Sequence, residues 1–167
     1  MDFYESDLED IIWDCLKTTE GANKLSERGL DAERPMKLFR QLKIGNYGIA
    51  DIVTVEKHIE LHKGKFSPKL YITVYELKRN DVNLESLVQI FRYIKGIDRY
   101  LEKRGWNHRD YEISGILIGK SVNNDDWVYM LEHIKDIYIY TYRYTVDGID
   151  FSWNEGRYFL IDQGFKM

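Results

Sequence analysis

The stretch "YITVYELKRNDVNLESLVQIFRYI", residues 71–94, decides the fold, because it joins an apolar strand, a charged strand end and a long helix. Alternate side chains of a strand share a face, so Glu76 and Lys78 extend the face of Ile72 and Val74. The two charged residues lie roughly 6.5–7 Å apart along such a strand. Ionised groups on a core-side face are costly unless they are paired or bind a metal ion. The end of this strand is therefore a candidate functional site.

The helix that follows presents polar side chains toward the same strand end. Asn83 is a suitable N-cap and Gly105 marks the helix end. Gln89 and Tyr93 are four residues apart, so they are neighbours on one stripe, beside the apolar stripe of the helix. We expect these two side chains to orient a water molecule, hold Lys78 or contact a phosphate.

A preceding strand, residues 49–55, carries a second charged residue on an otherwise apolar face. Asp51 alternates with Ile49, Val53 and Val55 after the turn signal "GNYG". Carboxylates of Asp51 and Glu76 on neighbouring strands would be satisfied by a divalent cation between them. Hard oxygen ligands of this type favour Mg²⁺ or Mn²⁺ over zinc.

The acidic first helix offers a further carboxylate. Glu5 and Glu9 are four residues apart, and one of them could complete the site. Each residue also has an ordinary explanation: a Glu-x-Lys pair is commonly an exposed charge pair, and acidic residues favour a helix start electrostatically. The order of the whole set is what indicates a site.

The remaining patterns predict a mixed α/β domain over residues 1–167. We expect no helix in the polar stretch that precedes Pro35, and Leu38, Arg40 and Leu42 on one face of the next strand. The other expected elements are a helix over 7–16, strands over 36–44 and 112–119, a basic hairpin tip or loop over 61–69, a short helix over 127–134, and a closing strand pair over 137–146 and 149–153. Strands and helices in this order predict a mixed sheet with a helix on at least one face.

Composition narrows the class of protein. The chain has 167 residues, one cysteine and a net charge of −4, which excludes an internal disulfide framework and argues against indiscriminate coating of nucleic acid. No apolar run approaches the ~18 residues of a membrane span, and the acidic N-terminus has no signal-peptide layout, so we expect a cytoplasmic protein. Residues 34–79 carry ten Lys and Arg against four Asp and Glu, and form either a phosphate-facing surface or a solvated hairpin.

Two other groups of residues, histidines and tyrosines, are not expected to form a metal or catalytic site. His58 and His62 lack a partner Cys or His pair for zinc, so phosphate contact or solvation is expected for both. Tyrosines alternate near the C-terminus and predict an amphipathic strand face that is packed or contacts a second copy of the chain, with base stacking as the third alternative; they are Tyr138, Tyr140, Tyr142 and Tyr144.

The motif order resembles the PD-(D/E)XK nuclease superfamily, and within it the nuclease domain of NucS-type endonucleases and their stand-alone relatives. The resemblance covers residues 5–118 and is carried by "ESDLEDII", "LFRQLKIGNYGIADIVTV", "YITVYELKRNDVNLESLVQIFRYI" and "ISGILIG". It implies a restriction-endonuclease-like α/β fold, with a mixed central sheet flanked by helices. The interval between Asp51 and Glu76 is longer than in the family and includes the extra basic hairpin.

The resemblance also implies roles for individual residues. Asp51 and Glu76, with the carbonyl of Leu77, would bind Mg²⁺ or Mn²⁺, and Lys78 would be the catalytic lysine. Gln89 and Tyr93 would be the accessory helix residues, and Glu5 the helix glutamate, with Glu9 as the alternative. The nucleic-acid-binding residues would be Arg40, Lys43 and Arg79.

The sequence therefore predicts a metal-dependent nuclease that hydrolyses phosphodiester bonds, in DNA rather than RNA, with a homodimer as a possible assembly. Two alternatives stay open. One is an inactive nuclease-fold module for nucleic-acid binding or assembly, and the other is an RNA-directed defence nuclease.

Overall fold

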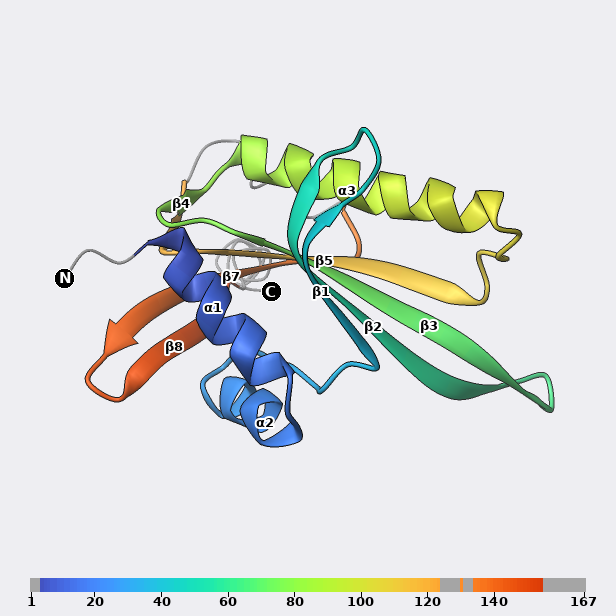
Figure 1. Ribbon diagram of the computed structural model, residues 1–167, viewed down its shortest axis with the longest axis horizontal. Coiled ribbons are helices and arrows are strands. Elements are labelled where there is room, and N and C mark those ends of the chain that lie inside the picture. The colour runs from blue at the N-terminus through green and yellow to red at the C-terminus, as the bar shows by residue number, and fades with distance from the viewer. Residues whose placement is uncertain (1–3, 124–129, 131–133, 155–167) are drawn as a thin grey trace, which may run out of the picture.

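The central feature of the computed structural model, which describes residues 4–123, 130 and 134–154, is a mixed β-sheet (Figure 1). The six strands of this described sheet lie in the order β1-β2-β3-β5-β7-β8. Their bounds are β1 Lys37–Lys43, β2 Ile49–His62, β3 Lys65–Leu77, β5 Tyr111–Gly119, β7 Ile137–Thr145 and β8 Gly148–Trp153. Strands β3, β5 and β7 are parallel to one another, and the outer pairs β1–β2, β2–β3 and β7–β8 are antiparallel. A small parallel pair is formed by β4 (Asp81–Val82) and β6 (Ser121–Val122).

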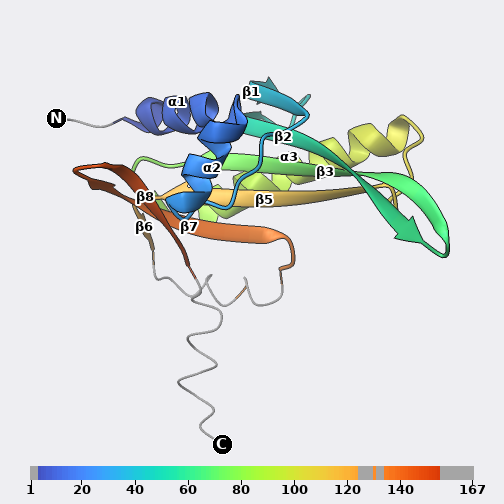
Figure 2. The same cartoon turned by 90° about the horizontal axis from the view of Figure 1, so that it is seen from below.

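Helices cover both faces of the sheet. Figures 1 and 2 show α3 (Leu84–Lys103) along one side, and α1 (Glu5–Leu16) and α2 (Thr19–Glu27) on the other. One apolar cluster packs α3 against residues such as Val53, Val74 and Leu117. A second cluster packs α1 and α2 against residues such as Ile52 and Leu77. The predicted α/β class, a mixed sheet flanked by helices, is confirmed.

The predicted long helix is also confirmed, together with its start signal. The side chain of Asn83 accepts a hydrogen bond from the Ser86 backbone N–H at 3.0 Å, which caps the first turn of α3. Gly105 follows the helix with a φ of +82°, a conformation that favours glycine.

The expectation of no helix before Pro35 is wrong, because α2 occupies part of this stretch. Thr18 caps it by accepting a hydrogen bond from Gly21 N–H at 3.0 Å, Ala22 and Leu25 are buried, and Leu25 belongs to the apolar cluster against the sheet. A Cβ atom at Gly21 would lie 2.2 Å from the Cys15 carbonyl oxygen, so glycine permits the close approach of α1 and α2.

The predicted face of β1 is wrong as well, because β1 and β2 twist sharply together. Gln41 has a φ of +48°, and Leu38 packs with the α1 cluster whereas Leu42 packs with the α3 cluster. On β2, Ile52 and Ala50 are divided between the two clusters in the same way, and Ile49, predicted on an apolar face, is 51% exposed. The strict alternation expected from sequence therefore fails on either side of Asp51 and Gln41.

The basic hairpin is longer than predicted and is formed by the ends of β2 and β3. Their register runs without interruption from the Ile52–Tyr75 pair to the His62–Lys65 pair. We call residues 57–69 the β2–β3 ribbon; it projects past the other strands in Figure 1. Apolar Ile59, Leu61 and Phe66 are exposed on it.

The predicted short helix over 127–134 falls almost entirely outside the described residues. The closing strand pair is present as β7 and β8, joined at the predicted Asp147–Gly148 turn. Tyr140 and Tyr142 are buried and Tyr138 and Tyr144 are exposed, so this strand face is partly packed. None of the described helices is long and apolar enough to cross a membrane.

Candidate active site

Asp51 is fixed at the twist of β2, where its two carboxylate oxygens have different donors. The backbone N–H of Leu77 donates to Oδ2 at 2.7 Å, and Nε2 of Gln41 donates to Oδ1 at 3.2 Å. Burial raises the pKa of Asp51 to about 6; the Leu77 hydrogen bond opposes this shift, and the negative charges of Glu9 and Glu5 add to it. The site thus holds Asp51 in place and makes its ionised form costly.

Glu76 is the most enclosed charged group of the site. The antiparallel register of β2 and β3 brings it beside Asp51, and the residue is only 4% exposed. Burial, followed by repulsion from Asp51, raises the pKa of Glu76 to about 7. Its Oε2 atom is buried without a hydrogen-bond partner among the described residues. An orphaned carboxylate oxygen of this kind is costly unless a proton or a cation satisfies it.

Lys78 neutralises part of this charge from the same strand. Its Nζ donates to Glu76 Oε1 at 2.8 Å, across the two-residue spacing that the sequence predicts. Burial alone would lower the pKa of Lys78, but the hydrogen bond and the charges of Glu76, Glu5 and Asp51 raise it overall. The ammonium group is therefore held in its charged form next to both acids.

Helix α1 brings both of its candidate glutamates to the site, in different ways. Glu9 is buried, and it accepts from Arg40 Nε at 2.6 Å and from Gln41 Nε2 at 2.9 Å. Gln41 therefore bridges Glu9 and Asp51. Glu5 accepts a hydrogen bond from the Arg79 backbone N–H at 3.1 Å, just after Lys78. Sequence spacing leaves the choice between these glutamates open, and in the structure both of their charges act on Asp51.

Helix α3 adds Tyr93, whose placement depends on a glycine. Burial, then the charges of Glu76 and Asp51, raise the pKa of Tyr93 to about 12, so its hydroxyl stays protonated beside the acids. Gly48 has a φ of +126°, and a Cβ atom there would lie 2.7 Å from Tyr93 Cε1. Gln89 is half-buried one turn earlier and makes no side-chain hydrogen bond to another described residue, so its role stays a prediction.

The donor set fits the predicted Mg²⁺ or Mn²⁺ ion. Two carboxylates with raised pKa values, the half-buried Asp51 and the buried Glu76, lie together, and the unpartnered Glu76 Oε2 supplies a free oxygen ligand. Oxygen donors without cysteine or histidine suit a hard cation. The part of the Leu77 carbonyl in such a site stays a prediction.

The three predicted nucleic-acid contacts have different surroundings. Arg40 is paired with Glu9 and also with Asp10, through Nη2–Oδ1 at 2.6 Å, so it orders α1 against β1. Lys43 is exposed at the end of β1. The Arg79 guanidinium lies 5.2 Å from the centre of the Tyr4 ring. Phosphate contact by each of them stays a prediction.

Gln41 is the residue of the site that sequence reasoning missed. It appears in the strand pattern as an ordinary outward polar residue, whereas its left-handed backbone turns its amide toward Glu9 and Asp51. Its position ten residues before Asp51 gives no local signal in the sequence.

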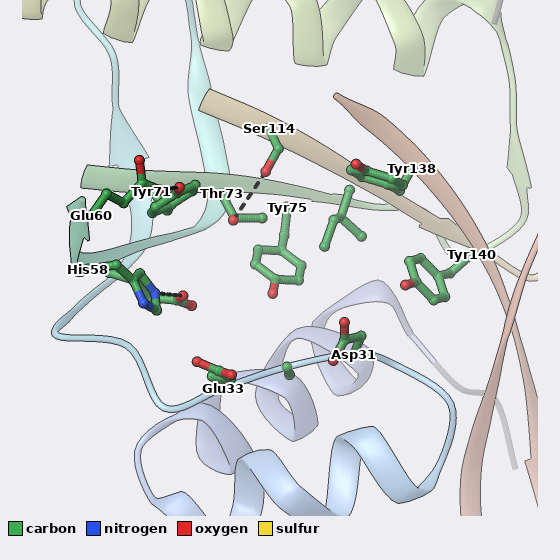
Figure 3. Close-up of a pocket in the computed structure, with 13 residues that line it drawn as sticks. Asp31, Glu33, His58, Glu60, Tyr71, Thr73, Tyr75, Ser114, Tyr138 and Tyr140 are labelled. Carbon is green, nitrogen blue, oxygen red and sulfur yellow. Dashed lines mark hydrogen bonds and ion pairs between the residues drawn. The ribbon is translucent and has the colours of Figure 1, made fainter. Parts of the chain in front are cut away.

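A separate groove of about 760 Å³ lies on the α1–α2 face of the sheet, away from the residues above (Figure 3). It is lined by Asp31, Ala32, Glu33, Glu56, His58, Glu60, Tyr71, Thr73, Tyr75, Ser114, Ile116, Tyr138 and Tyr140. None of these is a residue predicted for the nuclease site.

Comparison with known proteins finds likeness among solved structures. A repair endonuclease from Pyrococcus abyssi matches with a TM-score of 0.48 and 20% identity, over 83% of this chain and 46% of that chain. An EndoMS–dsDNA2 complex matches with a TM-score of 0.47 and 18% identity, over 84% of this chain and 46% of that one. This chain thus spans less than half the length of either. No family model and no curated protein matches the sequence. Each likeness concerns the fold, whereas the site is described by this chain's own residues.

Proposed function

We propose that this protein is a metal-dependent nuclease that hydrolyses phosphodiester bonds, with DNA as the preferred substrate. The observation that carries the proposal is the buried Glu76, which bonds Lys78 through one oxygen, leaves the other unpartnered and lies beside Asp51. An ion pair with Lys78 alone would leave the second oxygen of Glu76 buried without a partner beside a second carboxylate.

Asp51 and Glu76 would hold Mg²⁺ or Mn²⁺, which when bound polarises a phosphodiester and acidifies water. In the hydrolysis, a water oxygen adds to phosphorus, the bond to the leaving oxygen breaks, and that oxygen gains a proton. Lys78, charged and 2.8 Å from Glu76, is placed to stabilise the attacking hydroxide or the charge that builds on the phosphate. Glu9 and Gln41 keep Asp51 oriented, and the neutral Tyr93 hydroxyl can donate to a phosphate oxygen.

The test is a cleavage panel with Mn²⁺ or Mg²⁺ on single-stranded, duplex, branched and mismatched DNA and on matching RNA. We expect metal-dependent cutting of DNA, and a loss of about a hundredfold or more in rate for Lys78→Ala with a normal circular dichroism spectrum. Lys95→Ala is the matched control, because Lys95 pairs with Asp98 on the exposed side of α3.

Three results would contradict the proposal in whole or in part. Wild-type cutting rates in Lys78→Ala would remove the assigned role of the lysine. No cutting of any polymer, together with no thermal stabilisation by Mn²⁺, would favour an inactive module, because a metal that binds only the folded site must stabilise it. Faster cutting of RNA than of DNA would support the defence nuclease.

A further inference from the structure

The groove on the α1–α2 face is acidic, so its charge suits a cation and not a nucleic acid. Four carboxylates line it, from Asp31, Glu33, Glu56 and Glu60, and no lysine or arginine is among its lining residues in the described chain. Phosphate would be repelled here. His58, for which phosphate contact or solvation is expected from sequence, lies among these acids.

Three of the lining side chains place metal-binding atoms close together. One ligand atom each from Glu33, Glu56 and His58 lies within 4.8 Å of the other two. His58 Nε2 and Glu56 Oε2 are 3.4 Å apart, because residues two apart on β2 share a face. Ligands about 2.1 Å from a tetrahedral zinc ion are themselves about 3.4 Å apart, so only small side-chain movements separate this cluster from a bound geometry.

Tyr75 supplies an independent indication of a ligand. Its side chain is 4% exposed, and Figure 3 shows its hydroxyl pointing into the groove. The hydroxyl has no hydrogen bond to any other residue that the structure describes. Burial, then the charge of Glu56, raise the pKa of Tyr75 above its usual range, so the phenol remains a proton donor. A phenol whose ring is buried and whose hydroxyl faces the groove can donate to a water or a ligand held there.

A second cluster of possible metal ligands consists of Asp98, Glu102 and His108, and its members are paired with neighbouring side chains. Asp98 accepts from the Tyr111 hydroxyl at 2.7 Å, and His108 lies 2.9 Å from Glu102. These groups already satisfy one another. Glu33, in contrast, has no hydrogen bond or ion pair with another residue of the described ranges.

We infer that Glu33, Glu56 and His58 form a binding site for a divalent transition-metal ion such as Zn²⁺, separate from the nuclease site. One imidazole and two carboxylates are a ligand set that zinc accepts, with a remaining position for water facing the groove and Tyr75. The ion would tie the segment between α2 and β1, which contains Glu33, to β2. This site does not depend on the proposed nuclease activity.

The test is a Zn²⁺ titration by calorimetry of the whole chain carrying Glu76→Gln and His108→Ala, which disable the nuclease site and the second cluster. We expect one bound Zn²⁺ per chain. Adding His58→Ala or Glu33→Gln should weaken binding about tenfold or more, since loss of an outer partner alone costs that much in metal sites. His62→Ala is the matched control on the same strand and should leave the affinity unchanged.

Absence of Zn²⁺ binding in the parent variant would overturn the inference, as would equal affinity after His58→Ala and Glu33→Gln. Glu33, His58 and His108 are exposed and Glu76 is buried, and circular dichroism checks that each variant is folded.

Discussion

At the scale of single residues, Asp51 and Glu76 make the stability of the protein depend on pH. The pKa values of Asp51 and Glu76 are raised to about 6 and about 7 in the folded state. The folded chain therefore binds protons more readily than the unfolded chain between about pH 4 and 7. The stability that these neutral acids contribute is present at low pH and is lost as the pH rises through this window. Deprotonation in the same window prepares the site for a cation.

We therefore predict that Glu76→Gln stabilises the metal-free protein at pH 8. A neutral amide removes the buried charge, and the gain in free energy of unfolding should be about 1–3 kcal/mol, measured by urea denaturation. At pH 4.5 the gain should vanish. Exposed Glu27→Gln on α2 is the control. A lower stability of Glu76→Gln at pH 8 would show that the carboxylate is satisfied without metal.

Substitutions of Gln41 separate the effect of its left-handed backbone from the effect of its side-chain hydrogen bonds. We predict that Gln41→Gly keeps or raises stability, because glycine adopts a φ of +48° without strain, yet lowers metal-dependent cleavage because the amide between Glu9 and Asp51 is gone. Gln41→Asn, which tolerates the same backbone but has a shorter side chain, is the comparison. Cleavage by the glycine variant at the wild-type rate would assign Gln41 a purely conformational role.

At the scale of elements, sequence patterns predicted a helix or strand correctly wherever its capping residue and its apolar periodicity agree. Asn83, the apolar stripe of α3 and the alternation of β3 predict the elements that carry Glu76, Lys78 and Tyr93. They were insufficient at β1, where a left-handed residue without a glycine signal reverses the alternation. They also missed α2, although Thr18 caps it, because its nine residues are largely polar. Glu9 and Gln41 meet Asp51 only through packing between distant segments, which no local pattern encodes.

Substitutions in the β2–β3 ribbon test whether its basic residues contact phosphate or are only solvated. We predict that Lys57→Ala and Lys65→Ala each weaken binding of duplex DNA at all sequences alike. Each should also reduce the salt dependence of log affinity by about one unit, as expected for one lost phosphate contact. Fluorescence anisotropy at several salt concentrations measures both effects. Unchanged slopes in both variants, with Lys95→Ala as reference, would identify the ribbon as a solvated hairpin.

At the scale of the whole molecule, the candidate nuclease site and the groove differ in their cationic side chains. The nuclease site combines Lys78 with carboxylates from β2, β3 and α1, whereas the groove on the α1–α2 face is lined by four carboxylates and, among the described residues, by no lysine or arginine. A duplex should therefore approach the site along the lysine-bearing ribbon and avoid the groove.

The length of the ribbon also predicts how much duplex DNA the protein covers. Leu61, near the tip, is ten residues from Asp51 along β2, about 33 Å for an extended strand. This length is close to one helical turn of duplex DNA, about 34 Å. Substrates that extend less than about ten base pairs beyond the cut on one side should thus bind more weakly and become indifferent to Lys65→Ala. Competition between duplexes trimmed from either end measures the footprint, and equal affinity for all lengths would mean that recognition is confined to the scissile phosphate and its nearest neighbours.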